Sequence, residues 1–138
     1  MSTTLYALTG LVAWTLFLLI VMEAVRSYLV IAGKEKANGF DPLNTTLSPF
    51  MQRLARAHAN CLENLPVFAT IMLTASVTGQ SVITDPLAVP LLVLRVIQSG
   101  IHLYSLSAPA VTLRFCVFAL QIAIAVYWVI RLLTNVIY

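Results

Sequence analysis

Apolar positions dominate the chain in long runs, at residues 5–30, 50–80, 87–106 and 111–134. A bilayer-spanning helix needs about 20 mostly apolar residues, and all four segments contain such a run. In the second segment this run begins near residue 57. The pattern therefore predicts an all-α membrane protein in which residues 1–138 form a single bundle of four transmembrane helices.

The polar connections between these segments predict how the bundle lies in the membrane. Residues 34–49 form a long loop with Gly, Asn and Pro, and residues 78–86 form a short one that carries only Asp85. Lys and Arg gather around the first loop and are missing from the second. The positive-inside rule therefore places the first and third loops in the cytoplasm and both termini outside. The basic residues are Arg26, Lys34, Lys36, Arg53 and Arg56.

Composition supports this assignment and excludes several classes of protein. Hydrophobic residues make up 60% of the chain and charged residues only 9%, too apolar for an ordinary soluble domain. The helices leave no room for a second domain. The net charge of +3 suggests orientation in a membrane, not nucleic-acid binding. The N-terminus lacks a charged region and a cleavage site, so we expect the first helix to be retained.

The cysteines and histidines do not form a metal or redox motif. Cys61 and Cys116 lie in apolar runs without suitable spacing, and we expect small buried residues there. His58 and His102 lie on different helices, so no metal site is predicted. For His58 a structural hydrogen bond and a ligand contact both remain open.

A stripe of polar residues interrupts the second helix. Arg53, Arg56, Asn60 and Glu63 recur at intervals of three and four, so they share one helix face. Glu63 lies about ten residues past the predicted helix start, roughly 15 Å along the helix and near the bilayer midplane. Charged residues at such depths are costly and usually functional.

The third helix offers a partner for this stripe. Arg95 lies about eight residues from the predicted start of its helix, at a depth similar to that of Glu63. Gln98 and His102 continue the same face. We therefore predict an ion pair between Glu63 and Arg95. Either the pair belongs to a ligand site, or it only fixes the register of the two helices.

Arg114, near the start of the fourth helix, could be a snorkelling arginine at the membrane edge. It also belongs to a polar cluster that gathers toward the predicted cytoplasmic half. Arginines bind carboxylates in a fork geometry, and glutamate binds an ammonium group. The cluster would suit a zwitterionic peptide with two carboxylates. Its members are Arg26, Arg56, Asn60, Glu63, Arg95, Gln98, His102 and Arg114.

These residues resemble a known family. The stretch RAHANCLENLPVF at 56–68, the helix from Arg95 to His102 and the Ala-Pro turn before Arg114 are similar to the membrane-associated proteins in eicosanoid and glutathione metabolism (MAPEG). The resemblance extends over all four helices and is nearer to the bacterial branch than to the mammalian enzymes.

The resemblance implies a homotrimer in a bacterial inner membrane, with glutathione as co-substrate between neighbouring subunits near the cytoplasmic side. Arg114 would be the catalytic residue and would stabilise the glutathione thiolate. No metal is implied. The residues that the resemblance implies for glutathione binding are Arg26, Arg56, Asn60, Glu63, Arg95, Gln98 and His102.

The sequence also departs from the family pattern. Ala59 replaces an arginine of the mammalian enzymes, Gln98 a histidine, and His102 a tyrosine, while Phe118 lacks the hydroxyl found there. These departures bear on the reaction more than on the fold.

Three functions follow as hypotheses. The first is a glutathione transferase or peroxidase that acts on lipophilic electrophiles or lipid hydroperoxides taken from the bilayer. The second is a non-catalytic membrane protein of the same fold that binds a lipid or a protein partner. A transporter has less support because no inverted repeat is visible.

Overall fold

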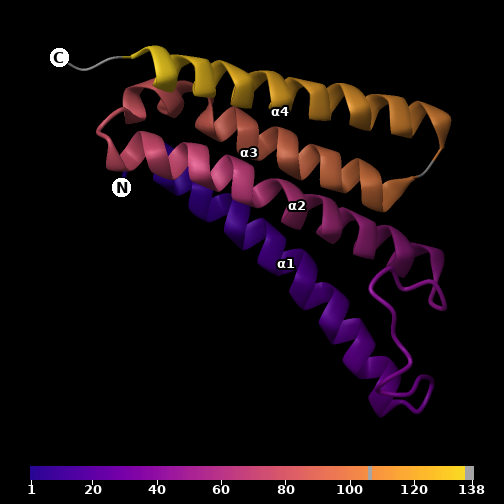
Figure 1. Cartoon of the computed structure of the whole chain (residues 1–138). Helices are drawn as coiled ribbons and strands as arrows, with labels where there is room; N and C mark the ends of the chain where they lie inside the picture. Colours follow the sequence, from indigo (N-terminus) through magenta and orange to yellow (C-terminus); the bar gives the residue numbers. More distant parts are fainter. Residues whose placement is uncertain (106, 136–138) are drawn as a thin grey trace.

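The computed structural model describes residues 1–105 and 107–135 and contains four helices. They are α1 (Thr3–Ile31), α2 (Pro49–Val77), α3 (Ser81–Tyr104) and α4 (Ala108–Thr134), which run alternately up and down (Figure 1). This confirms the predicted all-α class. By length and composition α1, α3 and α4 could each cross a membrane. α2 has the length of the other helices but does not meet the composition criterion, because its polar stripe lowers its hydropathy.

Local sequence signals set most of the helix ends. Ser2, Ser48 and Ser107 precede α1, α2 and α4, and each accepts a hydrogen bond from the backbone N–H three residues further on. These serines satisfy N–H groups that have no partner within the helix. Gly33 (φ +72°) and Gly79 (φ +70°) follow α1 and α2 in the left-handed conformation that ends many helices.

The predicted start of α3 at residue 87 is wrong, because the helix begins six residues earlier and continues through Pro86. Thr84 and Asp85 join this early part of α3 to α1. The Thr4 hydroxyl lies 2.6 Å from that of Thr84, and the Thr4 N–H donates to Asp85 at 2.8 Å. These contacts hold the first turn of α3 against the start of α1.

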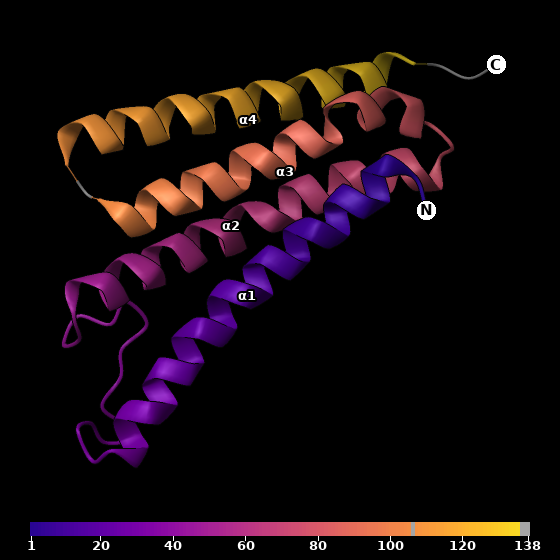
Figure 2. The ribbon, with the colours of Figure 1, turned by 180° about the vertical axis from the view of Figure 1, so that it is seen from behind.

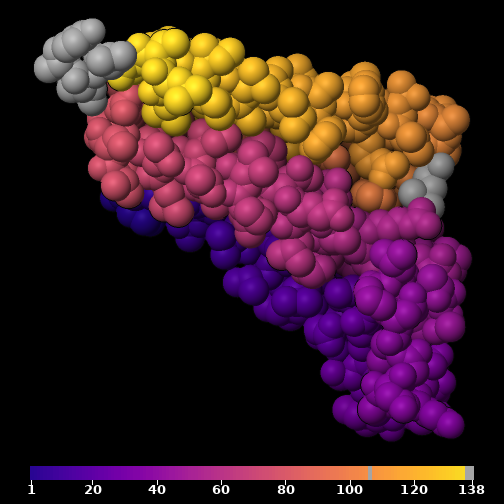
Figure 3. All heavy atoms as spheres, in the orientation of Figure 1, coloured from indigo at the N-terminus to yellow at the C-terminus, as the bar shows by residue number. Residues whose placement is uncertain are grey.

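Three of the helices form a layer, and α1 packs obliquely against it. α2, α3 and α4 lie side by side, and α1 packs on α2 and α3 near its N-terminal half (Figures 1 and 2). In the described part of the chain α1 does not touch α4. Toward its C-terminal end α1 diverges from the layer, and residues 32–48 cover the corner between α1 and α2 (Figure 3).

Two apolar clusters form the core, one around Phe68, Leu91 and Trp128 and the other around Leu18, Met51 and Leu54. Trp128, a member of the first cluster, is fully buried. Its neighbour Tyr127 is exposed.

Basic residues concentrate at one end of the bundle. This end holds the loop at 32–48 and the connection before α4. Of the eight Lys and Arg residues, only Arg95 and Arg131 lie elsewhere. The six at this end are Arg26, Lys34, Lys36, Arg53, Arg56 and Arg114.

Candidate functional site

A buried arginine lies at the centre of the polar residues. Arg95 on α3 is only 3% exposed. Its Nη1 donates to Oε1 of Gln98 at 3.1 Å and to Oε1 of Gln121 at 3.0 Å. Its Nη2 donates to Oδ1 of Asn60, and to the Cys61 sulfur at 3.6 Å. Arg95 therefore connects α2, α3 and α4 through side-chain amides.

The amides around Arg95 are also bonded to one another. Gln121, which is fully buried on α4, donates from Nε2 to Oε1 of Gln98 at 2.7 Å. Gln98 donates from Nε2 to Oδ1 of Asn60 at 3.3 Å. We call Asn60, Gln98 and Gln121 the amide cage. Since each amide is held by a second contact, the cage fixes the position of the guanidinium.

The predicted ion pair between Glu63 and Arg95 is absent from the described residues. There the one ion pair joins Arg26 and Glu23, at 3.1 Å. Glu63 is exposed on α2, one turn beyond Asn60. α3 ends at Tyr104, so Arg95 lies nine residues from that end, about 13 Å from the loop. That level is nearer to Asn60 than to Glu63.

A pocket opens beside the amide cage between α2, α3 and α4. Its volume is about 290 Å³. Arg114 lies on it with Phe118 one turn further along α4, and His102 is buried on the α3 side. The pocket thus brings together four of the predicted site residues. It is lined by Asn60, Gln98, His102, Val111, Arg114, Phe115 and Phe118.

The remaining residues of the α2 stripe do not join this pocket. Nε of Arg53 donates to the backbone carbonyl of Leu103 at 2.8 Å, near the C-terminus of α3. A cation at that end donates a hydrogen bond to a carbonyl without a partner in the helix, and it interacts favourably with the helix dipole. Arg56 and Glu63 are exposed on the surface of the protomer.

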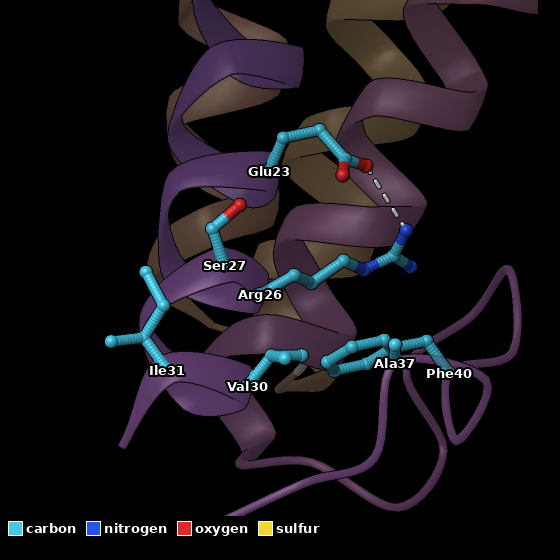
Figure 4. Close-up of a pocket in the computed structure, with 7 residues that line it drawn as sticks. All are labelled: Glu23, Arg26, Ser27, Val30, Ile31, Ala37 and Phe40. Atoms are coloured by element: carbon cyan, nitrogen blue, oxygen red, sulfur yellow. Dashed lines mark hydrogen bonds and ion pairs between the residues drawn. The ribbon is translucent and has the colours of Figure 1, made fainter. Parts of the chain in front are cut away.

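Arg26 is held by the loop at 32–48, away from the amide cage. Its Nε donates to Oδ1 of Asn44 at 3.0 Å, and its Nη2 donates to the Asp41 carbonyl at 3.1 Å. The guanidinium also lies over the ring of Phe40. Figure 4 shows Arg26 and Glu23 pointing from α1 toward this loop, beside a cavity of about 530 Å³. The predicted role of Arg26 in glutathione binding stays a prediction.

The two cysteines have different surroundings. Cys61 is buried, with its sulfur 3.2 Å from the hydroxyl of Ser99. Cys116 is exposed on α4, so the expectation that it is buried is wrong. Both are free thiols.

A comparison with models of known protein families shows to which family the chain belongs. The model described as "MAPEG family" matches residues 4–134, which is nearly the whole sequence. The chain belongs to the MAPEG family. No curated protein and no solved structure matches it. This family includes glutathione transferases and peroxidases as well as other members.

In this MAPEG protein, the residues that match the family model include the α2 stretch at 56–68, Arg95 and Arg114. Sequence reasoning missed Gln121, which completes the amide cage. A signal for it exists, because Gln121 is a polar residue in an apolar helix and lies seven residues after Arg114, on the same face. Its partner could not be read from the sequence.

Proposed function

We propose that this MAPEG protein is an integral-membrane enzyme that uses glutathione as co-substrate. It would transfer the thiol to lipophilic electrophiles or reduce lipid hydroperoxides drawn from the bilayer. The pocket that brings Arg114 beside Asn60, Gln98 and His102 is the observation that carries the proposal.

The charge around this pocket supports an anionic ligand. Arg114 lines the pocket and Arg95 lies directly behind Asn60 and Gln98, whereas no carboxylate lines it. Glutathione has two carboxylates and a thiol that can become an anion. Its single ammonium group needs an acid, and Glu63, one turn beyond Asn60, would supply one.

Arg114 is the residue best placed to support the chemistry. A cation beside a thiol favours the thiolate, which is the nucleophile. In a transfer the thiol proton would leave to solvent, a sulfur–carbon bond would form, and the leaving group or the activated double bond would take the electron pair. In a peroxidase reaction two glutathiones would give the disulfide, and the hydroperoxide would yield an alcohol and water. Phe115 and Phe118 would give the lipophilic substrate an apolar wall.

The exposed charges on α2 support an assembly of several copies. Arg56 and Glu63 lie on the protomer surface of a helix within the bundle. A carboxylate in contact with hydrocarbon is costly, so this face requires protein or a water-filled site against it. We propose a homotrimer in which these residues face a neighbouring copy and the ligand lies at the interface. The basic end would face the cytoplasm of a bacterial cell, across its inner membrane.

Replacing Arg114 with alanine tests the proposal. The R114A variant should bind glutathione in calorimetry but lose most of its activity toward a lipophilic electrophile or a lipid hydroperoxide. R131A is the matched control, because Arg131 is an exposed arginine at the other end of α4 whose side chain bonds to Tyr127. Full activity in R114A would exclude Arg114 from the mechanism.

A second candidate is a non-catalytic protein that binds a lipid. An apolar groove of about 510 Å³ between the end of α3 and the start of α4 favours it. Gly100 lines this groove, and the space beside it is open, because a methyl group there would meet no atom within 4 Å. Phe118 also lacks the hydroxyl expected from the mammalian enzymes. If the purified protein retained lipid but did not bind glutathione, this function would replace the first.

A further inference from the structure

Arg95 is held by neutral groups throughout the described part of the chain. The acceptors around its guanidinium are the three amide oxygens of the cage and the sulfur of Cys61. Its Nε, also buried, has no hydrogen-bond partner there. Amide oxygens satisfy N–H groups but carry no net charge, so the positive charge of Arg95 is not cancelled.

No acid of the protomer reaches this arginine. The chain has five Asp and Glu residues, and all of them lie in the described segments. The position of each acid shows that it does not bond to Arg95. Glu23 pairs on α1, Asp85 holds the start of α1, Glu35 and Asp41 belong to the 32–48 loop, and Glu63 is exposed on α2.

The cage places this charge next to the pocket. Asn60 and Gln98 bind Arg95 and also line the pocket, so a single layer of amides separates the guanidinium from a ligand. Gln121 does not line the pocket. It accepts from Arg95 and donates to Gln98, and so it closes the cage on the side away from the ligand.

We propose that Gln121 is a positioning residue, and that the neutral amide cage keeps the charge of Arg95 available for an anionic group of the ligand. Arg95 then acts on the ligand through the field of its charge, while Asn60 and Gln98 present their amides to it. The inference rests on the proposed function for the choice of glutathione as the ligand.

Gln121→Glu tests the inference because it gives Arg95 a counterion inside the protein. Without ligand, Q121E should raise the melting temperature of the detergent-purified protein, since a buried charge gains a partner. Gln121→Met has a similar size and no charge, and it should lower the melting temperature because the cage loses its hydrogen bonds. In the R95M/Q121E double variant the stabilisation should disappear, which assigns it to the pair.

Glutathione binding supplies the second measurement. Q121E should bind glutathione about tenfold more weakly than the unmodified protein despite its higher stability, because the charge is now cancelled. Equal affinity, or a Q121E melting temperature as low as that of Q121M, would overturn the inference. If the unmodified protein did not bind glutathione, the proposed function would fail. The melting temperatures without ligand would then be the test of whether the cage leaves the charge of Arg95 without a counterion.

Discussion

Replacing Asn44 with alanine should strongly destabilise the end of the bundle where α1 diverges. Asn44 is fully buried in the loop at 32–48 and has a left-handed backbone with φ of +55°. Its Oδ1 accepts hydrogen bonds from Arg26 of α1, and its Nδ2 donates to the Met51 carbonyl of α2 at 2.8 Å. One side chain therefore joins two helices that separate at this level.

The contacts give the size of the effect. A hydrogen bond to a charged group contributes about 1.5–3 kcal/mol, and the neutral bond to Met51 about 1 kcal/mol. Alanine in the left-handed region costs roughly 1 kcal/mol more, so N44A should lower the free energy of unfolding by about 4 kcal/mol. Asn44→Gly loses the same bonds without the backbone strain and should be about 1 kcal/mol less harmful.

Unfolding by sodium dodecyl sulfate in mixed micelles, followed by circular dichroism, would measure both variants. Thr46→Ala is a suitable control, since Thr46 is an exposed residue of the same loop. A loss below about 1 kcal/mol in N44A would refute the assigned hydrogen bonds. A glycine variant less stable than the alanine variant would refute the argument from the backbone.

Three further predictions concern other parts of the molecule. Asp85→Ala should cost about 1–2 kcal/mol in the same unfolding assay, because α1 loses the carboxylate at its N-terminus. Trp128→Ala should cost about 3–5 kcal/mol, whereas Tyr127→Ala should cost far less because that ring is exposed. Desolvation raises the pKa of Asp41, but hydrogen bonds from Thr45 outweigh it and hold the pKa below the usual 3.8. The stability that the ionised Asp41 side chain gives to the loop is therefore complete above pH 3.8 and is lost as the pH falls through the lower folded value. Pepsin should therefore cut the 32–48 loop faster in more acid solution, and in Asp41→Asn the rate of cutting should depend less on pH than in the unmodified protein.

Much of the fold could be predicted from the pattern of apolar residues. Four helices and the long polar loop follow from hydropathy, and Ser48-Pro49 marks the start of α2 within a residue or two. The start of α3 could not be predicted, because Pro86 is an ordinary stop signal in a sequence. The contacts of Thr84 and Asp85 with Thr4, which hold this part of α3 against α1, join residues about 80 positions apart and cannot be read from the sequence.

The error in α3 also explains the wrong partner for Arg95. A helix that begins at residue 87 places Arg95 at the depth of Glu63. With α3 beginning at Ser81 and packing antiparallel to α2, Arg95 meets Asn60 and Cys61 instead. The polar residues themselves were recognisable in the sequence. Their pairing, and the part played by Gln121, depend on how three helices pack.

The formation of glutathione thiolate tests the central claim most directly. Detergent-purified protein would be titrated with glutathione while the ultraviolet absorbance of the thiolate is recorded, with R131A as the matched control for R114A. We predict saturable binding with thiolate formation in the unmodified protein and in R131A, and binding without thiolate in R114A. No thiolate in the unmodified protein, or equal thiolate in R114A, would contradict the account.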